Sequence, residues 1–423
     1  MLMKRLLILL LLPLLAACGY RAPLHNSAPE DPARFTALRP DYRELAAQMA
    51  TDTGLAPSYG NTVSVITDQA QKFELLKADL AAAQESIYIE TYIFCPDEYG
   101  VQITDILAEK ASQNVDVRII IDMKANSIRN REALARLIKS GAAVFDFYGT
   151  STAIHRDHRK ITLIDGKIAY VGGRNIRDEY FTTWRDNDLR ISGPAVNDLG
   201  VSFMETQELV APGLVHIGVT GESALRAVDD RVPAIPRYLG KTVQIVPDTP
   251  QDGRTTIKDC YEWAINHARR YFYVYNPYSP IPSSIIKALE DAARRGVDVR
   301  WMVPANNDVP VSASINESLY RELLEAGVKV YEWKSTMNHT KQFITDDYLT
   351  AVGSCNMDKI GFYYNMEVKA LVYDEGVAAD AAALFRDDCD RRCRQVTLDE
   401  VKGWTIFRKA WNWFASTGSN LIL

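Results

Sequence analysis

The 423-residue sequence predicts an α/β protein made of two fused lobes that are related by a pseudo-twofold repeat. Two observations lead to this prediction: apolar strands alternate with amphipathic helices, and the second half of the chain restates the first. The composition agrees, because 47% hydrophobic residues, including 13 Phe, 21 Tyr and 7 Trp, can fill the cores of two or three domains. It excludes fibrous, disordered and small disulfide-stapled proteins.

The first residues are typical of a targeting signal. Lys4 and Arg5 precede an apolar run over residues 6–15, which is shorter than the roughly 20 residues that span a bilayer. Residues 15–18 (Leu-Ala-Ala-Cys) resemble the bacterial lipobox, which implies cleavage after Ala17 and diacylation of Cys18. We therefore expect a lipoprotein signal peptide over residues 1–17 and a lipidated Cys18. The alternative is an uncleaved N-terminal membrane helix.

Residues 18–59 contain five prolines among polar residues, which predicts a tether with a short helix over residues 42–50. Strands and helices alternate from residue 60 onward. The pattern predicts helices over residues 73–83 and 102–111, and strands over 86–94 and 115–122. This alternation indicates an α/β fold with a packed sheet.

The internal repeat defines the domain organisation. Residues 115–121 (Val-Asp-Val-Arg-Ile-Ile-Ile) reappear 182 residues later as Val-Asp-Val-Arg-Trp-Met-Val, and residues 135–144 match residues 321–330. We place the boundary between Gly221 and Lys241, where a new strand begins. The prediction is a first lobe over residues 60–235, a second lobe over 236–395 and an amphipathic C-terminal segment over 396–423.

The strongest signal for function lies at the same place in both halves. A pattern recurs with identical internal spacing at an offset of 181 residues: His158, Lys160, Asp165, Gly173 and Asn175, then His339, Lys341, Asp346, Ser354 and Asn356. The chain contains only six histidines. A repeat of this kind is therefore not a coincidence.

The spacing predicts a binding site for one anion. His158 and Lys160 are two residues apart on a predicted strand, so both project from one face. Asp165 begins a turn, and the returning strand brings Gly173 and Asn175 back to the same edge, where a small residue lets the backbone approach a phosphate and an amide donates to it. Two such half-sites facing each other predict a phosphodiester pocket shared by both lobes. A purely structural turn role for Asp165 and its copy remains an alternative.

Two carboxylates are candidates to orient the histidines. Asp186 and Glu367 each follow the asparagine of their motif by eleven residues. A carboxylate can hold an imidazole in one tautomer and raise its pKa. We assign this role to Asp186 and Glu367, with Glu179 and Asp188 as alternatives in the first half.

The paired motifs resemble those of the phospholipase D superfamily, and the resemblance covers most of residues 61–395. Residues 89–94 (Ile-Glu-Thr-Tyr-Ile-Phe), 184–186 (Trp-Arg-Asp) and 365–367 (Asn-Met-Glu) resemble the cardiolipin synthase branch. The chain departs from that branch at Asp188, where the branch tends to carry His. The resemblance implies two phospholipase D-like α/β/α sandwich lobes with one active site between them.

The resemblance also implies phosphatidyl transfer through a phosphohistidine, with no metal and no cofactor. His158 would be the nucleophile and His339 the acid. Simple chemistry is compatible with this, because a pKa near 6.5 makes both the neutral and the protonated imidazole accessible. Lys160 and Lys341 would stabilise charge on the phosphoryl oxygens. Water or a second alcohol would then attack the intermediate.

The cysteines do not predict a metal site. Apart from Cys18 there are five, an odd number, so at least one thiol stays free or pairs between chains. Cys389 and Cys393 lack the neighbouring His or second Cys pair of a zinc site.

The C-terminal segment carries an aromatic stripe. Trp404, Phe407, Trp411 and Phe414 follow each other at spacings of three, four and three, which is typical of one face of an amphipathic helix. This stripe could lie in a membrane interface, where Trp and basic residues are favoured. Packing against the catalytic lobes is the other interpretation.

A lipid anchor would hold the protein at a membrane, so we expect a phospholipid substrate and a cell-envelope location, on the periplasmic face of the outer membrane. Cardiolipin synthase-like transfer is the leading hypothesis, and hydrolysis to phosphatidic acid is the second. A periplasmic nuclease or phosphodiesterase is disfavoured by the net charge of -6 and by the lack of an aromatic and basic stripe. We expect no nucleic-acid partner. An inactive lipid-binding protein is disfavoured by the intact histidines.

Overall fold

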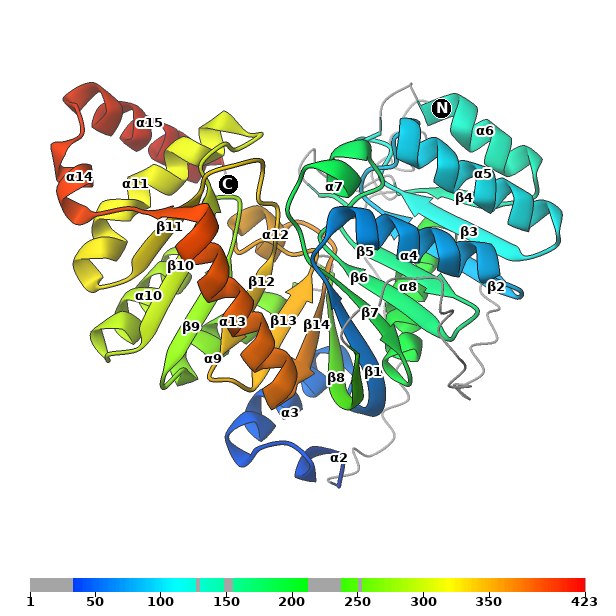
Figure 1. Cartoon of the computed structure of the whole chain (residues 1–423), viewed down its shortest axis with the longest axis horizontal. Coiled ribbons are helices and arrows are strands. Elements are labelled where there is room, and N and C mark those ends of the chain that lie inside the picture. Colours follow the sequence, from blue (N-terminus) through cyan, green and yellow to red (C-terminus); the bar gives the residue numbers. More distant parts are fainter. Residues whose placement is uncertain (1–32, 127–129, 148–154, 212–236, 250–252, 423) are drawn as a thin grey trace, which may run out of the picture. The chain divides into compact units, whose positions relative to one another are not determined.

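The computed structural model describes residues 33–126, 130–147, 155–211, 237–249 and 253–422 (Figure 1). The predicted signal peptide and Cys18 lie outside these residues, as does most of the predicted boundary between the lobes. Both predictions therefore remain untested by the fold.

The described residues form one 15-stranded sheet that runs through both lobes (Figure 1). From the centre outward, the first lobe contributes β1 (Ser58–Ile66), β7 (Asp188–Ser192), β6 (Ile168–Gly172), β5 (Lys160–Ile164), β2 (Ser86–Thr91), β3 (Asp116–Ile121) and β4 (Ala143–Asp146). The second lobe contributes β8 (Tyr238–Asp248), β14 (Glu367–Tyr373), β13 (Leu349–Gly353), β12 (Gln342–Thr345), β9 (Tyr271–Tyr275), β10 (Asp298–Pro304), β11 (Lys329–Trp333) and the edge strand β15 (Cys393–Gln395).

The two strand orders correspond one to one, apart from β15, and they meet where β1 and β8 pair antiparallel. In both lobes three outer strands pair parallel, β2–β3–β4 and β9–β10–β11. The strands nearer the centre pair antiparallel, as does the additional edge strand β15 with β11. The predicted α/β fold with two pseudo-twofold-related lobes is confirmed.

Helices cover both faces of the sheet. In the first lobe α4 (Gln69–Ala82), α5 (Glu98–Ser112) and α6 (Arg131–Lys139) cover one face and α8 (Ala195–Val210) covers the other. In the second lobe α9 (Thr256–His267), α10 (Ser283–Arg294) and α11 (Pro310–Ala326) oppose α13 (Glu375–Arg392). The short helices α7 (Asp178–Thr182) and α12 (Lys359–Tyr363) follow β6 and β13.

Apolar packing continues across the boundary between the lobes. Leu199 and Phe203 of α8 belong to the same buried cluster as Val368 and Ala370 of β14. Burying apolar area is the main favourable contribution to folding, at about 25 cal/mol per Å². The shared cluster and the continuous sheet join the lobes into one fold.

The two repeated segments, residues 135–144 and 321–330, contain the same backbone turn. Gly141 and Gly327 follow α6 and α11 with φ of +103° and +100°. Glycine adopts this left-handed conformation without a steric penalty, which ends the helix and returns the chain to the sheet.

The N-terminal segment is part of the globular fold from residue 38 onward, which differs from the prediction of a tether up to residue 59. It contains α2 (Ala33–Thr36), the 3₁₀ turn η1 (Pro40–Tyr42) and α3 (Arg43–Thr53). Leu45 and Met49 of α3 are buried in the core of the second lobe. The amide of Gln244 donates to Ala46 O and Leu55 O, at 2.9 and 3.0 Å.

The C-terminal segment forms α14 (Leu398–Gly403) and α15 (Ile406–Ile422), and α15 packs on α11. No helix within the described ranges is both long and apolar enough to cross a membrane. The five cysteines of the described part of the chain are free thiols.

Candidate active site

The two histidine-bearing loops are held by the opposite lobe. His158 N–H donates to Met366 O at 3.0 Å, and His339 N–H donates to Arg185 O at 2.7 Å. Each loop forms an isolated parallel bridge with the other lobe, between Asp157 and Met366 and between Arg185 and Asn338. Both histidines are buried. The fold thus brings the two motifs together at the lobe boundary.

The imidazole–carboxylate contacts also cross this boundary. His158 Nδ1 lies 2.8 Å from Glu367 Oε1, and His339 Nδ1 lies 2.8 Å from Asp186 Oδ2. Both carboxylates are fully buried. Asp186 and Glu367 therefore take the positions expected of orienting carboxylates, but each holds the histidine of the other lobe.

The carboxylates determine the tautomer of each ring. A carboxylate oxygen accepts a hydrogen bond, so Nδ1 carries the proton and the lone pair is on Nε2. Burial lowers the pKa of His158 to about 4, with Lys160 contributing and Glu367 opposing. Burial, with Lys341 and Lys160, lowers the pKa of His339 well below its usual value. In the unliganded site both imidazoles are neutral, and Nε2 of each has no hydrogen-bond partner among the described residues.

The two lysines are equivalent in geometry. Lys160 Nζ donates to His158 O at 2.6 Å, and Lys341 Nζ donates to His339 O at 2.5 Å. Burial lowers the pKa of Lys160 to about 8 and that of Lys341 to about 7. A bound phosphodiester adds one negative charge, which raises the pKa values of the lysines and imidazoles around it.

The aromatic surroundings of the two histidines differ. Tyr180, Trp184 and Tyr278 surround His339, with ring centroids 5.2, 5.6 and 5.7 Å away. Around His158 the corresponding contact is Tyr92, at 4.9 Å. Apolar rings exclude water and strengthen the electrostatic interactions beside them. The environment of His339 is therefore the more enclosed by aromatic side chains.

Four aromatic residues of the second lobe, Tyr278, Phe362, Tyr363 and Tyr364, lie in different locations. Tyr278 lies at His339, whereas Phe362 packs in the core against Tyr261, with ring centroids 5.5 Å apart. Tyr363 is exposed at the end of α12. Tyr364 contacts His155.

Asp165 and Asp346 do not reach the histidines. They lie at the far ends of β5 and β12, and the five residues of β5 span roughly 16 Å. Asp165 accepts from the backbone N–H groups of Gln84, Glu85 and Ser86, and Asp346 accepts from those of residues 269–271. Their inclusion among the site residues was wrong. They are turn residues that connect the β5–β6 and β12–β13 turns to the starts of β2 and β9.

Two residues predicted to bind phosphate support the carboxylates instead. Ser354 Oγ donates to Glu367 Oε2 and accepts from Val368 N–H at 3.0 Å. At Gly173 a Cβ atom would lie 2.4 Å from Asp186 Oδ1, so only glycine leaves room for this carboxylate. The small residues thus allow the close approach of a carboxylate rather than of a phosphate.

The two asparagines differ from each other. Asn175 accepts from Ile93 N–H at 3.1 Å and donates to the Tyr180 hydroxyl at 2.8 Å, so it positions a ring beside His339. Asn356 is buried, and its Oδ1 has no hydrogen-bond partner among the described residues. Asn356 therefore remains the better candidate of the two for a contact with substrate.

Three buried arginines were not identified from the sequence. Arg159 Nε donates to Glu367 O at 3.1 Å, Arg174 donates to Asp186 O at 2.6 Å, and Arg185 donates to the same oxygen at 2.9 Å. Their counterparts in the repeat are Thr340, Cys355 and Met366, so the repeat gives no signal for them.

The alternative orienting carboxylates of the first half are engaged elsewhere. Asp188 forms an ion pair with Arg174, and Glu179 pairs with Arg177 at 2.7 Å. Neither is the hydrogen-bond partner of a site histidine.

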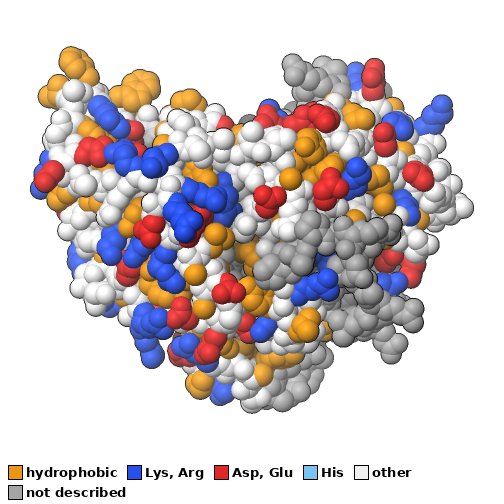
Figure 2. All heavy atoms as spheres, in the orientation of Figure 1, with side chains coloured by type: hydrophobic (Ala, Val, Ile, Leu, Met, Phe, Trp, Pro, Cys, Tyr) orange, Lys and Arg blue, Asp and Glu red, His pale blue; other side chains and the backbone are white. Residues whose placement is uncertain are grey.

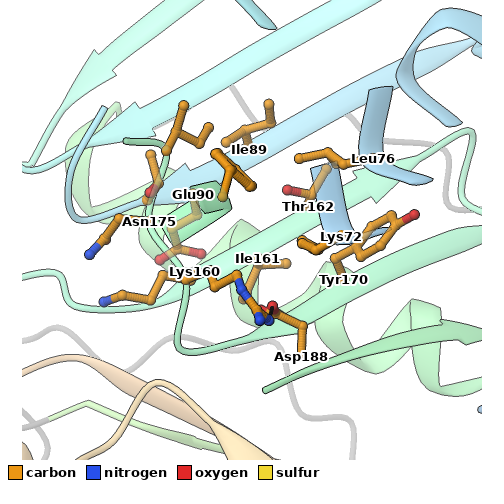
Figure 3. Close-up of a pocket in the computed structure, with 14 residues that line it drawn as sticks. Lys72, Leu76, Ile89, Glu90, Lys160, Ile161, Thr162, Tyr170, Asn175 and Asp188 are labelled. Atoms are coloured by element: carbon orange, nitrogen blue, oxygen red, sulfur yellow. Dashed lines mark hydrogen bonds and ion pairs between the residues drawn. The ribbon is translucent and has the colours of Figure 1, made fainter. Parts of the chain in front are cut away.

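A small cavity lies behind the first motif (Figure 3). Its volume is about 30 Å³, enough for one or two water molecules and too small for a lipid headgroup. Lys160 and Asn175 point to one side of it, and Lys72 and Tyr170 lie at the other end. No group of three or more His, Cys, Asp or Glu side chains in the described ranges is arranged to hold a metal ion.

The lowered pKa values make a testable prediction. In ¹⁵N-histidine NMR spectra of the free protein, the rings of His158 and His339 should remain neutral and Nδ1-protonated from pH 8 down to pH 6, because their burial disfavours charge. Spectra of His158→Ala and His339→Ala identify the two signals. Half-protonation of either ring near pH 6.5, the value of an exposed histidine, would contradict the assignment.

Comparisons with known proteins agree with this geometry. Residues 76–205 and 262–389 match the family described as cardiolipin synthase, PLD-like domain. The chain is 29% identical over 362 residues to a cardiolipin synthase of Listeria monocytogenes, covering 82% of this chain and 73% of that one. It is 31% identical over 362 residues to cardiolipin synthase 2 of Bacillus anthracis, covering 82% and 69%.

A solved structure of phosphatidylserine synthase from Haemophilus influenzae has the same fold, with a TM-score of 0.70, 14% identity and coverage of 89% of this chain and 98% of that one. The two family matches fall in the two lobes and include both histidine motifs. The chain therefore belongs to the phospholipase D-like family of the cardiolipin synthase type, with one copy of the domain in each lobe.

Proposed function

We propose that this protein is a phosphatidyltransferase that acts on phospholipid phosphodiesters, as a cardiolipin synthase does. One observation carries the proposal: two neutral imidazoles, each oriented by a carboxylate from the other lobe, lie in one buried site with two ammonium groups. Such a site can bind one phosphodiester, attack its phosphorus and protonate its leaving group. The similarity to the cardiolipin synthases of Listeria and Bacillus supports a phospholipid substrate.

In the first step His158 Nε2 attacks phosphorus and the bond from phosphorus to the leaving alcohol breaks. His339, in its protonated form, acts as the general acid and donates a proton to the alcohol oxygen. Lys160 and Lys341 stabilise the charge on the non-bridging oxygens. The products are a phosphatidyl group on His158 and a free alcohol, which is glycerol when the donor is phosphatidylglycerol.

We assign His158 as the nucleophile because its carboxylate is the more firmly ionised. Glu367 accepts hydrogen bonds from His158 and Ser354, and despite burial these interactions lower its pKa. Burial raises the pKa of Asp186, the partner of His339. An ionised carboxylate increases the basicity of the imidazole that donates to it.

In the second step an acceptor hydroxyl transfers its proton to His339 and attacks phosphorus, and the bond from phosphorus to His158 breaks. A second phosphatidylglycerol as acceptor yields cardiolipin, whereas water yields phosphatidic acid. The three rings around His339 lie where the acceptor must enter, and their apolar surface disfavours water. This enclosure favours transfer over hydrolysis.

Product analysis tests the proposed reaction. Incubation of the protein with phosphatidylglycerol vesicles should yield cardiolipin and free glycerol in equal amounts, as measured by mass spectrometry. Phosphatidic acid as the sole product would mean that water takes the intermediate and that the protein is a phospholipase D. The absence of any lipid product would contradict the proposal and leave a nuclease or phosphodiesterase as the hypothesis to examine.

Alanine substitutions test the two histidine roles. His158→Ala removes the nucleophile and should abolish turnover, and His339→Ala should lower kcat by about 10²–10⁴-fold through loss of general acid–base catalysis. The exposed His267 on α9, which stacks on Trp263, provides a matched control: His267→Gln should retain full activity. EDTA should not inhibit. More than a tenth of the parent activity in either alanine variant would rule out the assigned roles.

We further propose, from the sequence, that Cys18 carries a lipid and holds the protein in the cell envelope, at the periplasmic face of the outer membrane. Cys18→Ser should lower the fraction of the protein that stays in washed membranes, because the covalent anchor is lost. Activity on detergent-dispersed lipid should remain. Retention of the variant in the washed membrane pellet would argue against lipidation as the main anchor.

A further inference from the structure

The outer face of α15 is unusually apolar. Phe407 is 83% exposed and Trp413 is 67% exposed, and Ile406, Trp411 and Phe414 are exposed as well. Figure 2 shows hydrophobic side chains projecting at the edge of the molecule where Figure 1 places α15. A cluster of large apolar side chains on one surface helix is uncommon unless it contacts something.

The inner face of α15 is polar. Arg408 forms an ion pair with Glu317 of α11 at 2.7 Å, and Asn412 Nδ2 donates to the same carboxylate at 2.8 Å. At 100° per residue, positions 408, 412 and 415 share one side, whereas 406, 407, 410, 413 and 414 share the opposite side. The helix therefore directs its polar residues toward the protein and its large apolar residues outward, the reverse of an ordinary surface helix.

The charge of this segment indicates what covers the outer face. Residues 401–423 contain no Asp or Glu. Lys409 of α15 lies beside Lys402 of α14, since its Nζ donates to Lys402 O at 2.7 Å. Trp, Phe and Lys on one helix are the combination that lies in the headgroup layer of an anionic bilayer. We propose that α15 docks this protein on an anionic phospholipid membrane, lying in the plane of the interface with Phe407, Trp413 and Phe414 inserted.

The docking face continues toward the active site. Trp411 Nε1 donates to Ser314 of α11 at 3.0 Å, and Val311, one turn earlier on α11, is 50% exposed. Asp308, just before this helix, accepts from the Tyr278 hydroxyl at 2.7 Å. The Tyr278 ring is the one that lies 5.7 Å from His339.

The docked orientation has a consequence for the proposed reaction, on which this step rests. A bilayer that contacts α15 would also contact the start of α11. This end of α11 is close to the aromatic side chains around His339. A phospholipid could then enter the site from the membrane without exposing its acyl chains to water, which is unfavourable.

Vesicle binding by the full chain tests the docking face. In a Cys18→Ser background, the bound fraction is measured by sedimentation with vesicles of phosphatidylcholine and phosphatidylglycerol. Brominated acyl chains should quench the fluorescence of Trp413. This component is identified as the difference between the spectra of the parent and the Trp413→Phe variant. The triple variant Phe407→Ser, Trp413→Ser, Phe414→Ser should bind at least tenfold more weakly, and omission of phosphatidylglycerol should weaken binding of the parent.

Two controls keep the result specific. Leu239→Ser removes an exposed apolar side chain from β8 and should leave binding unchanged. His158→Ala should bind as the parent does, so a failure of the proposed chemistry does not affect this test. Unquenched Trp413 with unchanged binding of the triple variant would overturn the proposal. So would a concentration-dependent dimer that the triple variant abolishes, because a second copy of the chain would then cover this face.

Discussion

The crossed contacts between imidazole and carboxylate are the interaction on which the rest of the site depends. His158 pairs with Glu367 and His339 pairs with Asp186, so neither lobe contains a complete catalytic group by itself. Both pairs are buried, and removal of one partner leaves a buried polar group without its hydrogen bond, which costs about 1–3 kcal/mol. This requirement explains why the sheet runs unbroken through β1 and β8 and why a single apolar cluster spans the boundary.

Burial makes the site responsive to its ligand. Without an anion the imidazoles stay neutral, because burial and the lysines lower their pKa values. The negative charge of a bound phosphodiester raises the pKa values of the imidazoles and so favours protonation of one of them. The phosphodiester substrate thus favours formation of the general acid. Nucleophile and acid can therefore both start as neutral imidazoles.

The two halves of the active site are not identical, although the lobes are related by pseudo-symmetry. Ser354 supports Glu367, whereas its counterpart Gly173 contributes only space beside Asp186. Among the residues that the structure describes, three aromatic rings contact His339 and one contacts His158. On the side of His339, a series of contacts connects Tyr278 through α11 to the apolar face of α15. The enclosed half of the site is therefore also the half that faces the proposed membrane surface.

Local patterns in the sequence determined the α/β class, the two halves, the histidines and lysines of both motifs and the two orienting carboxylates, because spacing along a strand or helix decides which residues share a face. Which carboxylate meets which histidine depended on how the lobes dock, and no local spacing encodes that. The turn role of Asp165 and the support that Ser354 gives to Glu367 likewise involve partners distant in sequence or on another strand. The aromatic stripe was visible as a pattern, but Trp404 lies before α15 and packs on the core. Only the packing of Arg408 and Asn412 on Glu317 decided that Phe407, Trp411 and Phe414 face outward.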